Sequence, residues 1–170
     1  MEKNAKIREI YTIGHSTRRL EELVSCLKAY GVTLLVDVRA IPYSRYNPQF
    51  NREGLIEQLP EQGIGYLHLT ALGGNRPSKE TMEKARSCSE RSRGFSAYMK
   101  SEEFKEALAT VESYASSGEV IALMCGEIDP THCHRFWIAE ELQEKEWELT
   151  HILHEKEALP HPRTLFSSLE

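Results

Sequence analysis

The segment from Cys125 to Arg135 carries the side chains best suited to chemistry. Its eleven positions, CGEIDPTHCHR, hold two thiols, two imidazoles, carboxylates and a guanidinium. An apolar run over 120–124 precedes it and a helical pattern follows it. If the run is a buried strand, these groups lie at its carboxyl end, against a helix amino terminus whose free backbone N–H groups attract anions. We therefore expect a functional site at this junction.

Cys125 has two interpretations. It could be a nucleophilic thiolate, favoured by the helix amino terminus, by His132 or His134 and by Arg135. It could equally be a small buried apolar residue. The Cys-x9-Arg spacing is four residues longer than the Cys-x5-Arg phosphate loop of tyrosine-phosphatase-type enzymes, so that mechanism is not supported. Rhodanese-like sulfur transfer is an analogy of architecture alone.

Arg135 continues the apolar stripe of the following helix at i, i+3, i+4 and i+7, so it should face the sheet. Helical side chains lean toward the amino terminus, which aims the guanidinium at the turn holding Cys125 and at an anion there. The alternative is a structural salt bridge to Glu127 or Asp37. Glu127 is then either a general acid or base, or the partner of Arg135. The candidate catalytic group is Cys125, Glu127 and His134.

A metal site is a third possibility. Cys125, Cys133 and His134, or His132, could supply ligands, with His15 added from another loop. The spacing resembles no regular zinc knuckle, and adjacent residues rarely both reach one ion. A metal-dependent hydrolase is therefore kept as an alternative.

Alternating apolar runs and helical patterns predict an α/β fold. The expected strands are 10–14, 34–38, 66–69, 120–124 and 149–153. Such alternation gives a mostly parallel sheet of about five strands, with helices on both faces in three layers. We expect a single domain over 1–170, with 70–100 as a long, partly helical excursion and 156–170 as a tail.

Ligands bind outside the carboxyl ends of the strands in open α/β sheets, and polar side chains follow most of the expected strands. The candidate ligand-binding residues are His15, Ser16, Asp37, Arg39, Ser44, Gly73, Gly74 and Arg135. Their types suit a phosphate-bearing or otherwise anionic ligand.

The segment 39–52 interleaves arginines with aromatic rings. Such a mixture can stack bases and pair phosphates, which makes a nucleotide or nucleic-acid-binding module the alternative from another class. The competing interpretation is a loop packed by its own aromatic side chains. The net charge of −5 lowers the nucleic-acid hypothesis without removing it.

The four cysteines are irregularly spaced, and the chain shows neither a leading basic-plus-apolar segment nor a long apolar run. We expect free thiols, a cytosolic location and no membrane span.

Several short motifs occur together in this chain. They are Thr12-Ile-Gly-His-Ser16, Asp37-Val-Arg39 with Pro42, Ser44 and Phe50, Leu72-Gly-Gly74, and Cys125-x-Glu127 with Cys133-His-Arg135. In this combination the chain resembles the domain-of-unknown-function 488 family over about residues 8–155. The resemblance implies an α/β fold with these residues clustered, and it names no reaction. The leading hypothesis is a small enzyme that binds an anionic ligand at the strand ends, with Cys125 as its reactive thiol.

Overall fold

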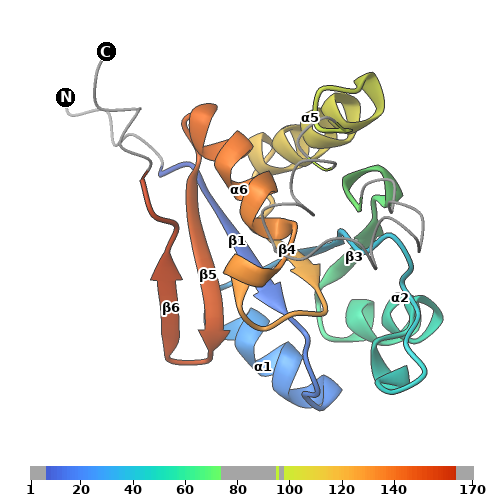
Figure 1. Ribbon diagram of the computed structural model, residues 1–170. Helices are drawn as coiled ribbons and strands as arrows, with labels where there is room; N and C mark the ends of the chain where they lie inside the picture. The colour runs from blue at the N-terminus through green and yellow to red at the C-terminus, as the bar shows by residue number, and fades with distance from the viewer. Residues whose placement is uncertain (1–6, 74–94, 96–97, 164–170) are drawn as a thin grey trace.

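A six-stranded sheet forms the centre of the molecule (Figure 1). The computed structural model describes residues 7–73, 95 and 98–163. The strands, in the order β3-β2-β4-β1-β5-β6, are β1 (Glu9–Gly14), β2 (Leu34–Asp37), β3 (Gly65–His68), β4 (Ile121–Cys125), β5 (Glu148–His154) and β6 (Glu157–Pro160). The first five in this order are parallel, and β6 runs antiparallel to β5. The predicted mostly parallel α/β sheet is confirmed.

Helices cover both faces of the sheet, as predicted. Helices α1 (Leu20–Ala29) and α2 (Arg52–Glu61) pack on one face, and α5 (Glu102–Ser116) and α6 (Arg135–Glu144) on the other. The two faces form separate apolar clusters, and every residue of β2 and β4 is buried between them. Among the described residues, three short 3-10 helices lie in the connections, at Pro48–Phe50, Thr70–Leu72 and Pro130–His132.

The sixth strand lies in the segment that the sequence assigns to a tail. Residues 157–160 instead pair with β5, and His161 directly after them is buried. Pro160 cannot donate a hydrogen bond, so its position at the sheet edge is where a strand tolerates proline. A short, largely exposed strand containing proline has no clear alternating pattern, which explains why the sequence did not reveal it.

The predicted excursion over 70–100 begins with the 3-10 turn at Thr70–Leu72, but most of it, including Gly74, lies outside the described residues. Within the parts of the chain that are described, no helix has the length and apolar character needed to cross a membrane.

The strand order brings three connections to one edge of the sheet. The carboxyl ends of β2, β4 and β1 are adjacent, with Gly14 in register with Cys125. Backbone hydrogen bonds continue past the strands: the His15 N–H donates to the Cys125 carbonyl at 2.9 Å, and the Val38 N–H donates to the Met124 carbonyl at 3.0 Å. The loops that follow these strands are therefore held together along this edge.

Candidate functional site

Two hydrogen-bonding groups lie next to the sulfur of Cys133. Helix α6 starts at Arg135 with His134 as its N-cap residue, so Cys133 lies at the helix amino terminus. Its Sγ accepts from the Arg135 backbone N–H at 3.5 Å and lies 3.6 Å from His134 Nδ1. The thiol of Cys125 donates to the Glu127 carbonyl at 3.8 Å and is a further neighbour of this sulfur. Such a set of neighbours favours the negatively charged form of the sulfur.

The imidazole of His134 lies beside this sulfur. Nε2 donates to the Val38 carbonyl at 2.7 Å, so the atom facing Cys133 is Nδ1. The neighbouring Cys125 thiol, followed by His134 and the charge of Arg135, lowers the pKa of Cys133 to about 4. Burial alone would lower the pKa of His134, but the hydrogen bond and the charge of Cys133 outweigh it and raise that pKa. Both shifts favour the thiolate and the imidazolium over the neutral pair.

Cys125 has the opposite environment. It is only 2% exposed, belongs to the apolar cluster under α5 and α6, and its Sγ lies 3.8 Å from the Glu127 carbonyl. Burial, together with the adjacent sulfur of Cys133, raises the pKa of Cys125 well above its usual value. This burial favours the second interpretation of Cys125, a protonated thiol inside the core. The half-buried sulfur at this edge belongs to Cys133.

Arg135 is fully buried beneath the loop that follows β4. Its guanidinium donates to Thr12 Oγ1 at 3.1 Å and to the carbonyls of Glu127 and Ile128 at 2.7 and 3.3 Å. Within the described residues its Nε has no partner. The salt bridge that we considered, to Glu127 or Asp37, is not formed: the Glu127 side chain is exposed, and its carbonyl makes the contact. Arg135 therefore fixes the loop. Among the described residues, no carboxylate pairs with its buried positive charge.

A second polar cluster lies at the same edge on the opposite face. The Arg39 guanidinium binds both carboxylate oxygens of Asp37, at 2.9 and 2.7 Å, and donates to the Phe50 carbonyl at 2.7 Å. The Tyr66 hydroxyl donates to Asp37 at 2.6 Å, and Arg39 Nη1 lies 3.4 Å from His15 Nε2. Two charged groups inside the protein are thus compensated by each other and by hydrogen bonds.

His15 completes this second cluster as a neutral imidazole. Nδ1 donates to the Ser16 carbonyl at 2.8 Å, which leaves Nε2 as an acceptor facing Arg39. Burial lowers the pKa of His15, and the charge of Arg39 lowers it further. The ring stacks on Phe50 with centroids 4.5 Å apart. Ser16 adopts the left-handed conformation, with φ of 48°, so that the chain turns sharply after β1.

One residue of backbone joins the two clusters. Val38, whose carbonyl accepts from His134, stands between Asp37 and Arg39 in the chain. A movement of the carboxyl end of β2 would therefore displace residues of both clusters. The predicted strand-end residues share one edge, but their side chains divide between the two faces of the sheet.

Positive charge exceeds negative charge among the buried side chains of this edge. Arg18, Arg39 and Arg135 are all buried, whereas Asp37 is the only buried carboxylate in the described part of the chain. The Arg18 guanidinium donates to the carbonyls of Gly14 and Leu153. The thiolate of Cys133 offsets one of the remaining charges, and an anion near this edge would be attracted by the other.

Two predicted ligand-binding residues are instead engaged in backbone packing. The Ser44 hydroxyl accepts the backbone N–H groups of Tyr46 and Asn47, which closes a turn within the 39–52 segment. A Cβ on Gly73 would lie 2.5 Å from the Ala40 nitrogen, so glycine is required there for close chain approach. Gly74 lies outside the described residues.

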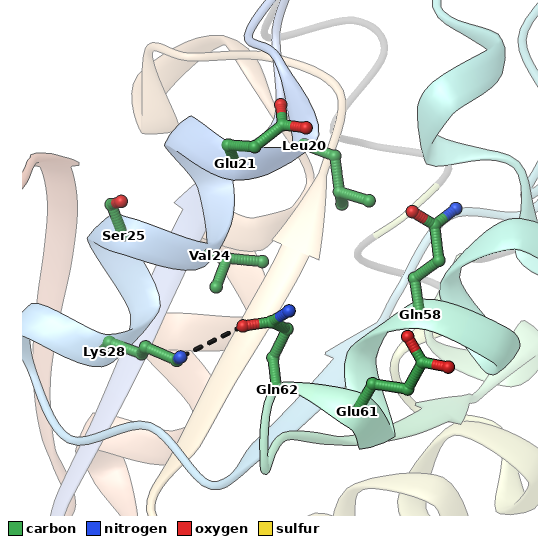
Figure 2. A pocket seen from close by; sticks show the side chains of 8 residues that line it. All are labelled: Leu20, Glu21, Val24, Ser25, Lys28, Gln58, Glu61 and Gln62. Carbon is green, nitrogen blue, oxygen red and sulfur yellow. Dashed lines mark hydrogen bonds between the residues drawn. The ribbon is translucent and has the colours of Figure 1, made fainter.

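No group of three or more histidine, cysteine or acidic side chains is placed to hold a metal ion in the described segments. A groove of about 300 Å³ does lie between α1 and α2 (Figure 2). Its lining residues are Leu20, Glu21, Val24, Ser25, Lys28, Gln58, Glu61 and Gln62, and they include none of the reactive groups.

Sequence reasoning considered Cys133 only as a metal ligand and gave no role to Thr12 or Tyr66. The missed signal for Cys133 was its place directly before a histidine at the start of a helix. Thr12 stood only in the motif that carries the family resemblance, and for Tyr66 the sequence offered no signal beyond a hydroxyl in a strand.

Comparison with known proteins gives one result. A family described as "Domain of unknown function DUF488" matches residues 19–142. The match spans the Asp37–Arg39 cluster and the whole segment from Cys125 to Arg135, and it ends before β5. Neither the curated proteins nor the solved structures contain a match.

Proposed function

Because the chain belongs to the DUF488 family, whose name assigns no activity, we propose a function from the site itself. The protein is a thiol-dependent enzyme that acts on an anionic ligand, with Cys133 as its nucleophile. The observation that carries this proposal is the position of Cys133 Sγ at the start of α6, 3.6 Å from His134 Nδ1 and 3.5 Å from the Arg135 backbone nitrogen. A sulfur held in this way at a helix amino terminus is nucleophilic at neutral pH.

Each neighbour of the thiolate has a role in the proposed reaction. Cys133 attacks an electrophilic centre, and His134, within reach of the same sulfur, protonates the leaving group. Arg135 is too buried to touch a ligand, so it supplies positive charge and fixes the loop over β4. This assignment moves the nucleophile from Cys125 to Cys133 and the acid from Glu127 to His134. A reducing cytosol would keep both thiols in the required form.

The excess of buried arginines supports an anionic ligand, such as a phosphate-bearing molecule, near the open end of the site. A thermal-shift panel of inorganic phosphate, nucleotides, short single strands and divalent metals tests the ligand class, because binding to the folded state raises the melting temperature. We expect a rise with phosphate-bearing ligands that weakens as salt is added. Indifference to every anion in the panel would contradict the ligand assignment.

The reactivity of Cys133 and the electrostatic potential around it can be tested together with two matched reagents. Iodoacetate and iodoacetamide carry the same leaving group and differ in charge. We expect the rate ratio of iodoacetate to iodoacetamide at Cys133 to be higher in the folded protein than in the same protein unfolded in urea, because the surrounding charge attracts the anion. Peptide mapping locates the adduct, and Cys133→Ser serves as the control. An equal or lower ratio in the folded protein would overturn the anionic preference.

A second candidate function is supported by the surface of the 39–52 segment. Tyr43 and Tyr46 are 64% and 88% exposed, and Arg45 and Arg52 beside them are exposed as well. Unstacked rings next to cations suit a single-stranded nucleic acid. Fluorescence anisotropy with a short labelled oligonucleotide should then show salt-dependent binding that the Tyr43→Ala, Tyr46→Ala double variant loses. Absence of binding by the native protein at low salt would remove this candidate.

A further inference from the structure

Two free thiols meet at the centre of the site. Cys125 ends β4 and Cys133 precedes α6. Cys125 Sγ lies 3.8 Å from the Glu127 carbonyl, which also accepts from the Arg135 side chain, and Cys133 Sγ lies 3.5 Å from the Arg135 backbone nitrogen. Both belong to the apolar cluster that fills the space between the sheet and the helices α5 and α6. The loop between them is fixed from below by Arg135, which binds the carbonyls of Glu127 and Ile128. The two thiols therefore lie in one cluster, joined by a loop that Arg135 holds in place.

The two sulfurs differ in accessibility and in their neighbours. Cys133 is half-buried, and His134 Nδ1 and the Arg135 backbone N–H lie at 3.6 and 3.5 Å from it. Cys125 is 2% exposed and lies behind it, in the core. An accessible sulfur that reacts first, backed by a sheltered thiol that reacts second, is the arrangement of a redox dithiol. A simple nucleophile would not need the second thiol.

We propose that Cys125 and Cys133 form a redox dithiol, in which a hydroperoxide oxidises Cys133 and Cys125 then closes a disulfide with it. This inference rests on the proposed function only in taking Cys133 as the reactive sulfur. It adds an activity, reduction of hydroperoxides by two electrons, that requires no further cofactor beyond an external thiol for regeneration.

Both steps balance. In the first, Cys133 Sγ attacks the terminal peroxide oxygen, the O–O bond breaks, and the leaving alkoxide takes a proton from His134; the products are a sulfenic acid and an alcohol, or water from hydrogen peroxide. In the second, Cys125 Sγ attacks Cys133 Sγ, the S–O bond breaks, and the departing hydroxide leaves as water with the thiol proton of Cys125. The two sulfurs are oxidised by two electrons in total, and the peroxide is reduced by two. An external dithiol restores both thiols by exchange.

Cys26 provides a matched control within the same chain. It is 3% exposed, similar to Cys125, but lies on α1 against the opposite face of the sheet. Burial raises its pKa, as it does for Cys125. Burial alone therefore cannot distinguish the two thiols, and only Cys125 has Cys133 beside it.

The experiment treats the full chain with hydrogen peroxide, blocks remaining thiols with N-ethylmaleimide, and maps the cysteines by mass spectrometry. We expect the native protein to lose two hydrogens and to yield a Cys125–Cys133 disulfide that dithiothreitol reverses. Cys125→Ser should instead gain one oxygen at Cys133, trapped by dimedone, while Cys26→Ser behaves like the native chain. Cys125→Ala replaces the serine variant if circular dichroism shows that Cys125→Ser is unfolded.

Oxidation of Cys133 to sulfinic or sulfonic acid with no disulfide in the native chain would overturn the inference, as would identical products from the native chain and Cys125→Ser. Parallel samples alkylated with iodoacetamide in mild acid separate this failure from that of the proposed function. Alkylation of Cys133 without a disulfide in the peroxide experiment would contradict the redox dithiol and leave the assignment of Cys133 as the nucleophile standing. No alkylation of Cys133 in mild acid removes the nucleophile itself.

Discussion

The charge on the Cys133 sulfur depends on the imidazole beside it. His134 is held by two contacts at once: Nε2 binds the Val38 carbonyl at 2.7 Å and Nδ1 faces the sulfur at 3.6 Å. A hydrogen bond that involves a charged group contributes about 1.5–3 kcal/mol, and one pKa unit corresponds to about 1.4 kcal/mol. The imidazolium alone thus accounts for a shift of about one to two units in the pKa of Cys133.

Replacing His134 by glutamine should separate the effect of its positive charge from that of its hydrogen bond to the Val38 carbonyl. The glutamine amide can still donate to the Val38 carbonyl, but it carries no positive charge. We expect the pKa of Cys133, read from the pH dependence of its alkylation by iodoacetamide, to rise by about one to two units.

His68→Gln is the control for this substitution, because His68 Nε2 lies 2.8 Å from the Arg39 carbonyl at the same edge and has no hydrogen bond to a sulfur in the described part of the chain. Its Cys133 profile should match that of the native chain. An unchanged profile in His134→Gln would show that the imidazole does not control the thiolate.

At this scale the sequence located the reactive segment but could not rank its two sulfurs. The position of Arg135 on an apolar helical stripe predicted a buried guanidinium aimed at the turn after β4, and the structure has it there. Which cysteine faces the core depends on how the loop folds back over β1, through the contact of Arg135 with Thr12. Such a contact joins positions 123 residues apart and leaves no local trace in the sequence.

The end of β1 and the loop after β4 form one packed unit. Gly14 is in register with Cys125, and the Ser16 N–H donates to the Gly126 carbonyl at 3.0 Å. A Cβ on Gly14 would lie 1.8 Å from the Glu127 carbonyl oxygen, the acceptor for Arg135. The absence of a side chain at Gly14 therefore lets the loop close over the strand.

Gly14→Ala should destabilise the fold by about 1–3 kcal/mol, because an added methyl group forces this backbone apart. Urea denaturation followed by circular dichroism measures the change. Gly54→Ala is the matched control: Gly54 is in α2, and its Cβ would meet only the Gln58 side chain at 3.6 Å. There the same substitution should stabilise by up to about 1 kcal/mol through helix propensity. Equal stability of Gly14→Ala and the native chain would contradict the close packing.

Elements with strong periodicity were predicted well, and the weakly patterned one was missed. The runs 34–38 and 120–124 nearly coincide with β2 and β4, because strands covered on both faces are continuously apolar. β6 escaped notice since it is mostly exposed and ends at Pro160. The side chain of His161, directly after this strand, is buried, and no local pattern in the sequence indicates that burial.

A chain of buried hydrogen bonds crosses the molecule from the site to the last strand. Arg135 donates to Thr12, Thr12 lies 2.6 Å from His151 Nδ1, His151 Nε2 lies 2.9 Å from His161 Nδ1, and His161 Nε2 lies 2.8 Å from Glu140. The order of the strands, with β1 between β4 and β5, is what brings these residues together, and order cannot be read from local patterns.

This series of hydrogen bonds predicts that the stability of the fold depends on pH. Burial, then the charges of His161 and Arg135, lower the pKa of His151 to about 3 from its ordinary 6.5. Between these values the unfolded chain binds a proton that the folded chain excludes, so stability is complete above about pH 6.5 and falls as the pH drops toward 3, by at most about 1.4 kcal/mol per unit from this group. His15, whose pKa burial also lowers, acts in the same direction.

Urea titrations at several pH values between about 4 and 7 measure this slope. His151→Asn retains an acceptor for the Thr12 hydroxyl but cannot be protonated, so its stability should depend less steeply on pH than that of the native chain. A variant whose slope equals the native slope would show that His151 is not the group responsible.

The most direct test of the site is the pH profile of iodoacetamide alkylation at each cysteine of the native protein, resolved by peptide mapping. We predict that Cys133 reacts with a midpoint near pH 4, the value to which its pKa is lowered, and at a constant rate through neutral pH, while Cys125 stays unmodified. A Cys133 rate that rises only near the ordinary thiol pKa of about 8.5, or a Cys125 that reacts first, would contradict the assignment of Cys133 as the thiolate.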